Sequence, residues 1–163
     1  MEIILPPDFL SITSNKHLLL DTSVFIDGFA HPSEFARFFN RLKANNTTLV
    51  TISSVLSEFL KGSTTEAIFN KKKEFVEDIV ETTLPDINLQ DNVEILIKKY
   101  GIESKDLSIT DLYLGATLVK YGRNICLLTR DLSDFPTNIF KRVTFLNLAH
   151  TKGIFTFGVY CYV

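Results

Sequence analysis

The sequence has no tryptophan, a single methionine and only two cysteines in 163 residues. Its start, MEIILPPDFL, lacks the basic n-region and the long apolar run of a signal peptide. No segment reaches the length of a membrane-spanning helix, and internal repeats, low-complexity tracts and linkers are missing as well. We therefore expect one cytoplasmic domain over residues 1–163 that makes no use of a membrane.

The two cysteines, Cys126 and Cys161, are too few and too far apart for a metal-binding pattern. Cys126 falls inside the apolar run NICLLT, as a buried cysteine would. Disulfides are rare in a reducing compartment, so we expect both side chains to be buried free thiols.

A large excess of charge is also missing, because 17 basic side chains face 19 acidic ones and the net charge is -2. The overall field of the protein therefore gives no reason to expect nucleic-acid binding. It does not exclude such binding, since a local patch or a bound metal ion can supply positive charge to a phosphate. With 45% hydrophobic residues, the chain can bury a substantial core.

What the sequence does have is an alternation of short apolar runs and amphipathic segments. This alternation predicts an α/β domain with a mainly parallel sheet of about five strands. Strands are expected at residues 18–20, 49–52, 125–128 and 143–146, and helices at residues 34–44, 53–61, 64–80, 91–100 and 108–121. The tail GIFTFGVYCYV is rich in aromatic and β-branched residues, so we expect extra strands at the termini, outside the alternating core.

Two aspartates follow predicted strands. Asp21 ends the run HLLLD, and Asp131 comes two residues after the strand ICLLT. Ligands of open parallel sheets bind at the carboxyl ends of the strands, where side chains leave the core. Both carboxylates should therefore emerge at the same edge of the sheet.

Two further acids have two interpretations each. Asp111 lies within the apolar arc of its helix, where a buried charge needs a partner, but its spacing from Ser108 also fits a capping box. Glu58 lies at the margin of the apolar face of residues 53–61, so it is either a site residue or a solvated helix glutamate.

Four carboxylates that converge at one edge would repel one another unless cations held them together. Oxygen ligands without a nearby histidine or cysteine suit Mg²⁺ or Mn²⁺ rather than zinc. The usual chemistry of such a site is the hydrolysis of phosphodiester bonds, in which the ion activates water and stabilises the leaving oxygen.

Four stretches of the sequence resemble the acidic motifs of the PIN-domain nucleases, most of all the VapC-type toxin ribonucleases. They are LLLDTSVFI, SSVLSEFLKG, LSITDLYLGATL and LLTRDLSDFP, and together they span about residues 16–148. The resemblance implies a three-layer α/β/α fold, an Mg²⁺- or Mn²⁺-dependent endoribonuclease and the toxin of a toxin–antitoxin pair. RNA would be the substrate, a protein antitoxin a possible partner and a homodimer a possible assembly.

The resemblance also implies roles for individual residues. Asp21, Glu58, Asp111 and Asp131 match the catalytic, metal-binding acids of the family. The positions beside the first and fourth acids match supporting polar residues, here Thr22, Ser23, Thr129 and Asp134, and Asp134 is either an additional carboxylate or a loop cap. Arg130 is expected to contact the substrate phosphate if the chain turns directly after the strand.

Other functions remain open at this point. The same metal chemistry would serve a PIN-type RNA-processing enzyme or a DNA flap nuclease. A domain that keeps the fold and binds RNA or protein without cutting is a third alternative, although such a domain has no need of four mutually repelling acids.

Overall fold

The computed structural model describes residues 1–163 as seven α-helices and seven β-strands. The helices are α1 (Phe9–Thr13), α2 (Thr22–Ala30), α3 (Pro32–Ala44), α4 (Ser53–Leu60), α5 (Glu66–Ile79), α6 (Gln90–Tyr100) and α7 (Ile109–Tyr121). The strands are β1 (Glu2–Ile4), β2 (His17–Leu20), β3 (Thr48–Ile52), β4 (Thr82–Leu84), β5 (Ile125–Thr129), β6 (Lys141–His150) and β7 (Gly153–Cys161). All predicted helices and strands are present, although β6 is longer than expected.

The strands form one sheet in the order β1-β6-β7-β5-β2-β3-β4. The four strands β5, β2, β3 and β4 are parallel to one another. Since β7 is antiparallel to both β5 and β6, β6 runs in the same direction as these four, and only β1 and β7 run against it. The prediction of a mainly parallel sheet is confirmed.

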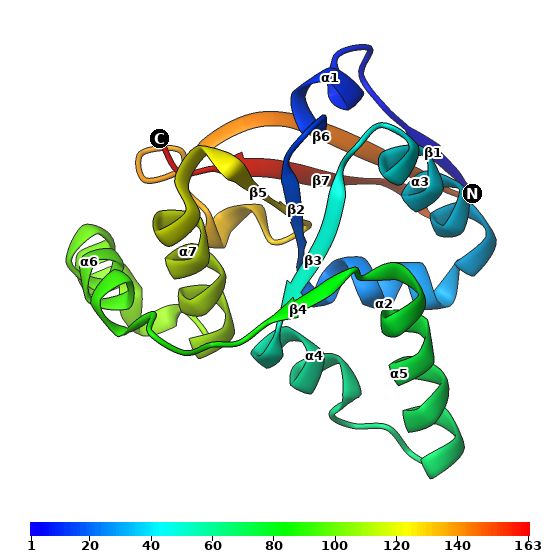
Figure 1. The fold of residues 1–163 in the computed structure, drawn as a ribbon, viewed down its shortest axis with the longest axis horizontal. Helices are drawn as coiled ribbons and strands as arrows, with labels where there is room; N and C mark the ends of the chain where they lie inside the picture. The colour runs from blue at the N-terminus through cyan, green and yellow to red at the C-terminus, as the bar shows by residue number, and fades with distance from the viewer.

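The parallel strands β2, β3 and β5 are buried on both faces, which explains their largely apolar sequences. Leu18, Leu19 and Leu20 of β2 are at most 1% exposed, and every residue of β5 is buried. In Figure 1, α6 and α7 lie on one side of these strands, and α2, α3 and α5 lie on the other. The domain therefore has the predicted three-layer α/β/α architecture.

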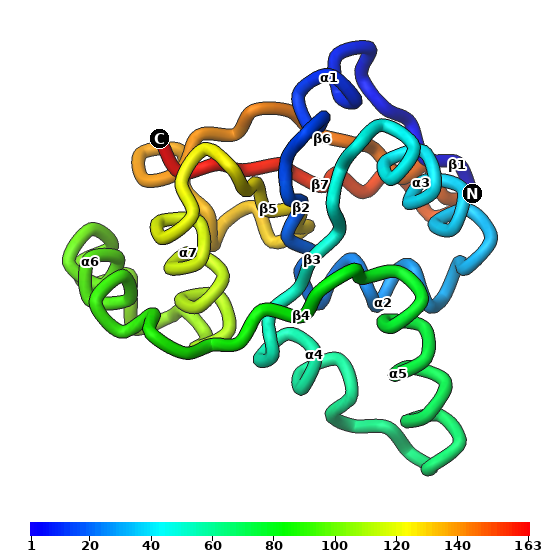
Figure 2. The backbone as a smooth tube through the Cα atoms, viewed as in Figure 1, coloured from blue at the N-terminus to red at the C-terminus, as the bar shows by residue number.

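The C-terminal tail corrects the sequence-based prediction. It forms β7, which lies inside the sheet between β5 and β6 rather than outside the core. The other terminal strand, β1, pairs with β6 at the sheet edge, and Figure 2 shows the two chain ends on opposite sides of the molecule. Hydrophobic composition predicts a strand, but it does not predict which neighbour the strand finds.

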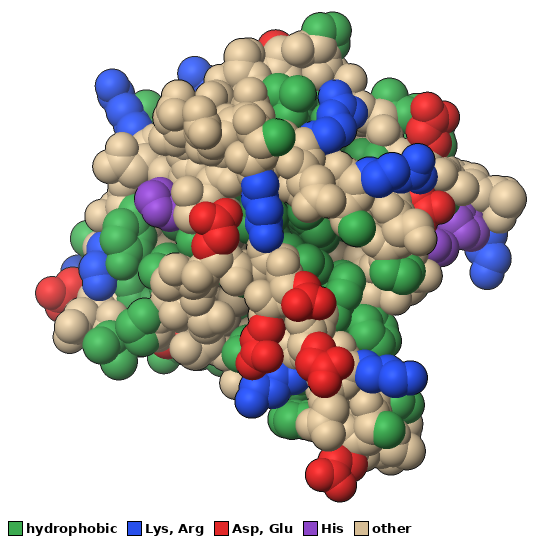
Figure 3. Space-filling model, turned by 45° about the vertical axis from the view of Figure 1, so that its right-hand side comes forward, with side chains coloured by type: hydrophobic (Ala, Val, Ile, Leu, Met, Phe, Trp, Pro, Cys, Tyr) green, Lys and Arg blue, Asp and Glu red, His purple; other side chains and the backbone are tan.

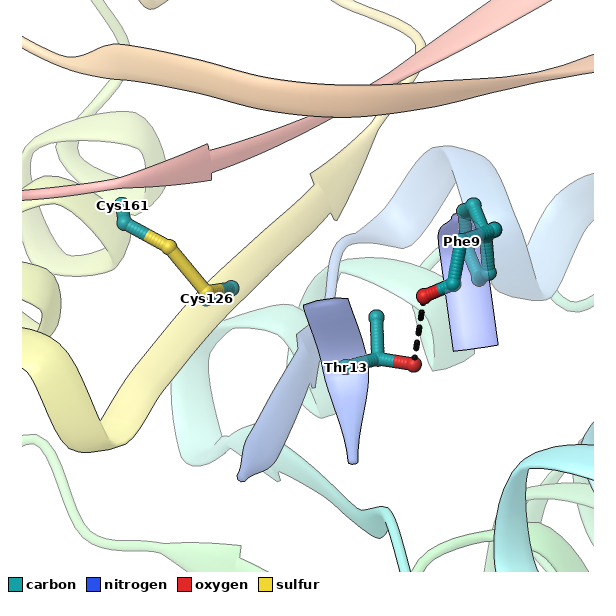
Figure 4. Close-up of a disulfide and its surroundings, with 4 residues drawn as sticks. All are labelled: Phe9, Thr13, Cys126 and Cys161. Atoms are coloured by element: carbon teal, nitrogen blue, oxygen red, sulfur yellow. Dashed lines mark hydrogen bonds between the residues drawn. A yellow bond between two sulfur atoms is a disulfide. The ribbon is translucent and has the colours of Figure 1, made fainter. Parts of the chain in front are cut away.

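The prediction of free thiols is wrong, because Cys126 and Cys161 form a disulfide (Figure 4). Leu127 of β5 is paired with Tyr160 of β7, so the two cysteines face each other across the same antiparallel pair. Their burial was predicted correctly, at 1% and 4% exposure. The error arose because their separation of 35 residues says nothing about strand pairing.

The β6–β7 hairpin extends beyond the carboxyl edge of the parallel strands. Thr129, the last residue of β5, is paired with Gly158, so the earlier residues of β7 continue past the end of β5. These residues pair with β6 as far as the couple His150–Gly153. The hairpin therefore flanks the edge at which the predicted site residues emerge.

Aromatic side chains fill much of the space between the sheet and the helices. Phe35, Phe38 and Phe39 of α3 are at most 3% exposed, as their helical spacing predicted, and Phe38 packs against Phe9 of α1. These rings belong to the core of the chain itself. None of the helices has the length and apolar character needed to cross a membrane.

Candidate active site

Asp21 lies at the junction of β2 and α2 and is only 3% exposed. It is the N-cap of α2, and its Oδ1 accepts a hydrogen bond of 2.6 Å from the backbone N–H of Thr22. Its Oδ2 accepts hydrogen bonds from Ser23 Oγ at 2.9 Å and from Thr129 Oγ1 at 2.7 Å. Three donors therefore fix this carboxylate in one orientation.

Burial raises the pKa of Asp21 to about 6, even though its three hydrogen bonds act in the opposite direction. The negative charge of Asp131 adds to this rise. Asp21 therefore changes its charge at a pH of about 6. A cation bound beside it would lower its pKa again.

Thr22 connects Asp21 to Glu58 on α4. Its backbone N–H binds Asp21, and its hydroxyl donates to Glu58 Oε2 at 2.9 Å. Glu58 itself is exposed, as expected for a helix glutamate, but this hydrogen bond holds its carboxylate at the end of β2. The exposure of Glu58 agrees with a solvated helix glutamate, and its role as a site residue stays a prediction.

The turn after β5 is bound to the same carboxylate. Thr129 Oγ1 donates to Asp21 and accepts a hydrogen bond of 3.0 Å from the backbone N–H of Asp131. Ser23 Oγ likewise donates to Asp21 and accepts one of 3.1 Å from the backbone N–H of Arg130. Two hydroxyl groups therefore set the position of the turn that carries Asp131.

Asp131 is exposed, and its pKa is affected by the charges around it. Partial burial raises its pKa, Arg130 lowers it, and the charges of Asp111 and Glu58 raise it further. Burial likewise raises the pKa of Asp134, a half-buried residue of the same turn, and the charges of Asp111 and Asp131 raise it further. Together with Asp21, the three acids Glu58, Asp111 and Asp131 form what we call the acidic cluster.

Asp111 is half-buried in the first turn of α7 and completes a capping box with Ser108. Its Oδ2 accepts hydrogen bonds from the backbone N–H of Ser108 at 3.2 Å and from the hydroxyl at 2.5 Å. The capping interpretation of Asp111 is therefore correct. The negative charge of Asp111 also contributes to the raised pKa of Asp131. Helix α7 is buried on most of its sides, so the apolar arc of its sequence does not show toward which neighbour the Asp111 side chain points.

The donor chemistry of the acidic cluster fits a hard divalent cation, since it offers only oxygen atoms and an excess of negative charge. No three acidic, histidine or cysteine side chains are close enough to hold an ion between them. Mg²⁺ usually keeps several waters and binds proteins through one or two carboxylates, so direct contact with every acid is not required.

Arg130 turns toward α2 rather than into solvent. Its Nη1 forms a salt bridge of 2.8 Å with Asp27 Oδ2, and its guanidinium lies 5.8 Å from the ring centre of Phe155. The sequence analysis did not identify Asp27 or Phe155. Nothing in their local sequence signals the contact, because Asp27 and Arg130 are 103 positions apart.

No curated protein and no solved structure matches this chain. The family model described as PIN domain matches residues 18–141, about three quarters of the sequence. This stretch begins in β2, ends at the first residue of β6 and includes all members of the acidic cluster. The chain therefore belongs to the PIN domain family, a family with a nuclease-type fold.

Proposed function

We propose that this PIN domain is an Mg²⁺- or Mn²⁺-dependent endoribonuclease. The observation that carries the proposal is the hydrogen-bonded frame at the carboxyl edge of the sheet, in which Thr22 links Asp21 to Glu58 of α4, and Thr129 links Asp21 to the turn that carries Asp131. A fold gains no stability from acids that repel one another, so their arrangement favours a function that needs negative charge.

Asp21 and its partners in the acidic cluster would hold the ion, which supplies an activated water and neutralises charge on the phosphate. The chain itself provides a rigid frame. Thr22 aligns Glu58, and Ser23 and Thr129 position the turn that carries Asp131. Fixed carboxylates of this kind are preorganised, so they need little rearrangement when substrate binds.

The finer assignment as the toxin of a toxin–antitoxin pair rests on the resemblance of the four motifs to VapC-type toxins. A protein antitoxin, a homodimer and a cytoplasmic location are part of this proposal. Expression of the wild type should then arrest growth, and Asp21→Asn should relieve the arrest. The Cys126–Cys161 disulfide favours an oxidising environment, so the thiol state in cells is an independent check of the location.

The test is incubation with total RNA in Mn²⁺ or in chelator, followed by mapping of the cut sites. Wild type should cleave only with the ion, Asp21→Asn should not cleave, and Asp8→Asn should cleave normally. Asp8 is a suitable control because it is an exposed aspartate at the start of α1 without a side-chain capping bond. Equal cleavage by wild type and Asp21→Asn would contradict the mechanism, and preference for a DNA flap substrate would favour the flap-nuclease alternative.

The second candidate is a binding module without catalytic activity. One observation favours it, namely that no three potential ligands are close enough to bind an ion together. Calorimetric titration with Mn²⁺ separates the two functions, because a nuclease of the proposed type must bind the ion and a pure binding module need not.

A further inference from the structure

Phe155 is a half-exposed aromatic residue that packs against Arg130, next to the turn that carries Asp131, and it has no role in the proposed reaction. It lies on β7 in the part of the β6–β7 hairpin that continues past the end of β5, and it is 41% exposed. The match to the PIN family ends at residue 141, so this side chain is a feature of the C-terminal segment of this chain.

Arg130 provides a second flat surface next to Phe155. Its guanidinium lies 5.8 Å from the ring centre, and its side chain is 37% exposed. The salt bridge of 2.8 Å to Asp27 fixes the guanidinium and balances its charge. A guanidinium held in this way remains a planar group on which an aromatic ring or a base can stack.

The pair is connected to the acidic cluster through one side chain. The backbone N–H of Arg130 donates to Ser23 Oγ at 3.1 Å, and Ser23 Oγ donates to Asp21 Oδ2 at 2.9 Å. The stacking surfaces therefore have a fixed position relative to the buried carboxylate of the site.

We propose that Phe155 and Arg130 form a stacking site for an unpaired RNA base next to the phosphate that the acidic cluster would cleave. This inference rests on the nuclease function proposed above and adds a base-binding site to it. The base must be unpaired, because the bases of a duplex are stacked inside the helix and cannot reach such a site.

The charge distribution explains why stacking is needed. The protein carries 19 acidic and 17 basic side chains, and Figure 3 shows both signs interspersed over one face without a continuous basic area. The acidic cluster itself repels an RNA backbone. Stacking of a base on an aromatic ring does not depend on net charge, and it contributes about 1–3 kcal/mol per base to the binding of single strands.

The chain offers a matched control on the same hairpin. Phe145 of β6 is 42% exposed, nearly the same as Phe155. Phe145 is paired with Gly158 and Phe155 with Leu148, so by strand alternation the two rings point to opposite faces of the sheet. Phe145→Leu and Phe155→Leu therefore remove the same group at nearly the same exposure, but on opposite faces of the hairpin.

The experiment is a binding titration by fluorescence anisotropy in chelator, with a labelled unpaired RNA of about 12 nucleotides. Phe155→Leu should weaken binding by about 5- to 100-fold, while Phe145→Leu should stay within about twofold of the wild type. Phe155→Trp should restore the affinity, and binding of a blunt RNA duplex should not respond to Phe155→Leu.

A scan with single abasic nucleotides locates the base. One abasic position should weaken binding to the wild type but not to Phe155→Leu, as expected when both changes remove the same contact. The stacking site would be overturned if Phe155→Leu bound RNA with wild-type affinity, or if Phe145→Leu lost as much affinity as Phe155→Leu. It would also be overturned if the wild type did not bind RNA.

These results are separable from a failure of the nuclease proposal. Binding that depends on Phe155, together with no Mn²⁺-dependent cleavage, would support the stacking site and overturn the nuclease function. Cleavage by the wild type with binding that is independent of Phe155 would overturn the stacking site alone. In an active enzyme, we expect Phe155→Leu to raise KM more than it lowers kcat, because the base does not take part in the reaction.

Discussion

Thr129 at the end of β5 donates a hydrogen bond of 2.7 Å to the carboxylate of Asp21 at the end of β2. The same hydroxyl accepts a hydrogen bond from the backbone N–H of Asp131. Thr129 and Asp21 are both at most 3% exposed. Two neighbouring strands are thereby joined at the point where the chain leaves the sheet. This contact determines where two of the four acids of the site lie.

Thr129→Val should therefore damage the site more than the fold. It removes the hydroxyl that donates to Asp21 and that accepts a hydrogen bond from the backbone N–H of Asp131. We therefore expect a loss of about 1–3 kcal/mol in the free energy of unfolding. RNA cleavage should fall at least about tenfold, because the turn that carries Asp131 loses its anchor. Urea denaturation and initial cleavage rates measure the two effects.

Thr13→Val is the matched control for this substitution. Thr13 is 1% exposed, and its hydroxyl donates to the backbone oxygen of Phe9 at 3.1 Å (Figure 4). It lies before the amino end of β2, the strand whose opposite end carries Asp21. A similar loss of stability with unchanged cleavage is expected. If both variants lost the same activity, Thr129 would have no special role in the site.

Asp21→Asn should make the protein more stable at neutral pH. The pKa of Asp21 is about 6 in the fold, against 3.8 for an ordinary aspartate, so the native state holds its proton more tightly than the unfolded state. Ionisation of wild-type Asp21 therefore destabilises the fold as the pH rises from about 4 to above 6, by at most about 3 kcal/mol. Asparagine avoids this cost because it carries no charge.

The measurement is urea denaturation in chelator at about pH 4 and about pH 8. The variant should exceed the wild type clearly at the higher pH, and the difference should shrink toward the lower one. Asp8→Asn gives the background effect of removing a carboxylate elsewhere. A difference that is the same at both pH values would show that Asp21 ionises normally.

Mn²⁺ should stabilise the wild type and not Asp21→Asn. An ion that binds only the folded state raises the free energy of unfolding by about 2.7 kcal/mol at a hundred times its Kd. Thermal unfolding with increasing Mn²⁺ should therefore raise the Tm of the wild type and of Asp8→Asn. Equal shifts in all three proteins would place the bound ion outside the acidic cluster.

Reduction of the disulfide should destabilise the sheet. The Cys126–Cys161 bond closes a segment with a sequence separation of 35 and joins β5 to β7, so in the chain-entropy description it contributes about 3–4 kcal/mol. A reducing agent should lower the Tm of the wild type. The double variant Cys126→Ser/Cys161→Ser should have a low Tm that does not respond to the reducing agent, and a wild-type Tm insensitive to reduction would contradict the prediction.

Local patterns in the sequence predicted local structure well. The leucine run of β2 and the apolar run of β5 are strands, and Ser108 and Asp111 form the capping box that their spacing indicated. These features depend on burial and on hydrogen bonds within a few residues, which a single sequence displays.

Relationships between distant segments could not be predicted in this way. The pairing of Cys126 with Cys161 and of Asp27 with Arg130 follows from the position of β7 and from the direction in which Arg130 turns. The disulfide depends on the strand with which β7 pairs, and the salt bridge depends on how the chain turns after β5. No short sequence pattern encodes either choice. The C-terminal residues therefore supply contacts that the acidic motifs alone do not indicate.

The position of β7 has a consequence for the order of folding. In the sheet, β6 pairs only with β7 and β1, so neither β6 nor β1 can join the parallel strands until β7 has paired with β5. A growing polypeptide that has reached only residue 152 thus leaves the edge of β5 open. Chains fold largely from the N-terminus during synthesis, and an open strand edge invites association with other chains. Strand β1, near the start of the sheet-forming sequence, can therefore join the parallel strands only through β7, and the sheet is complete only when β7 has paired.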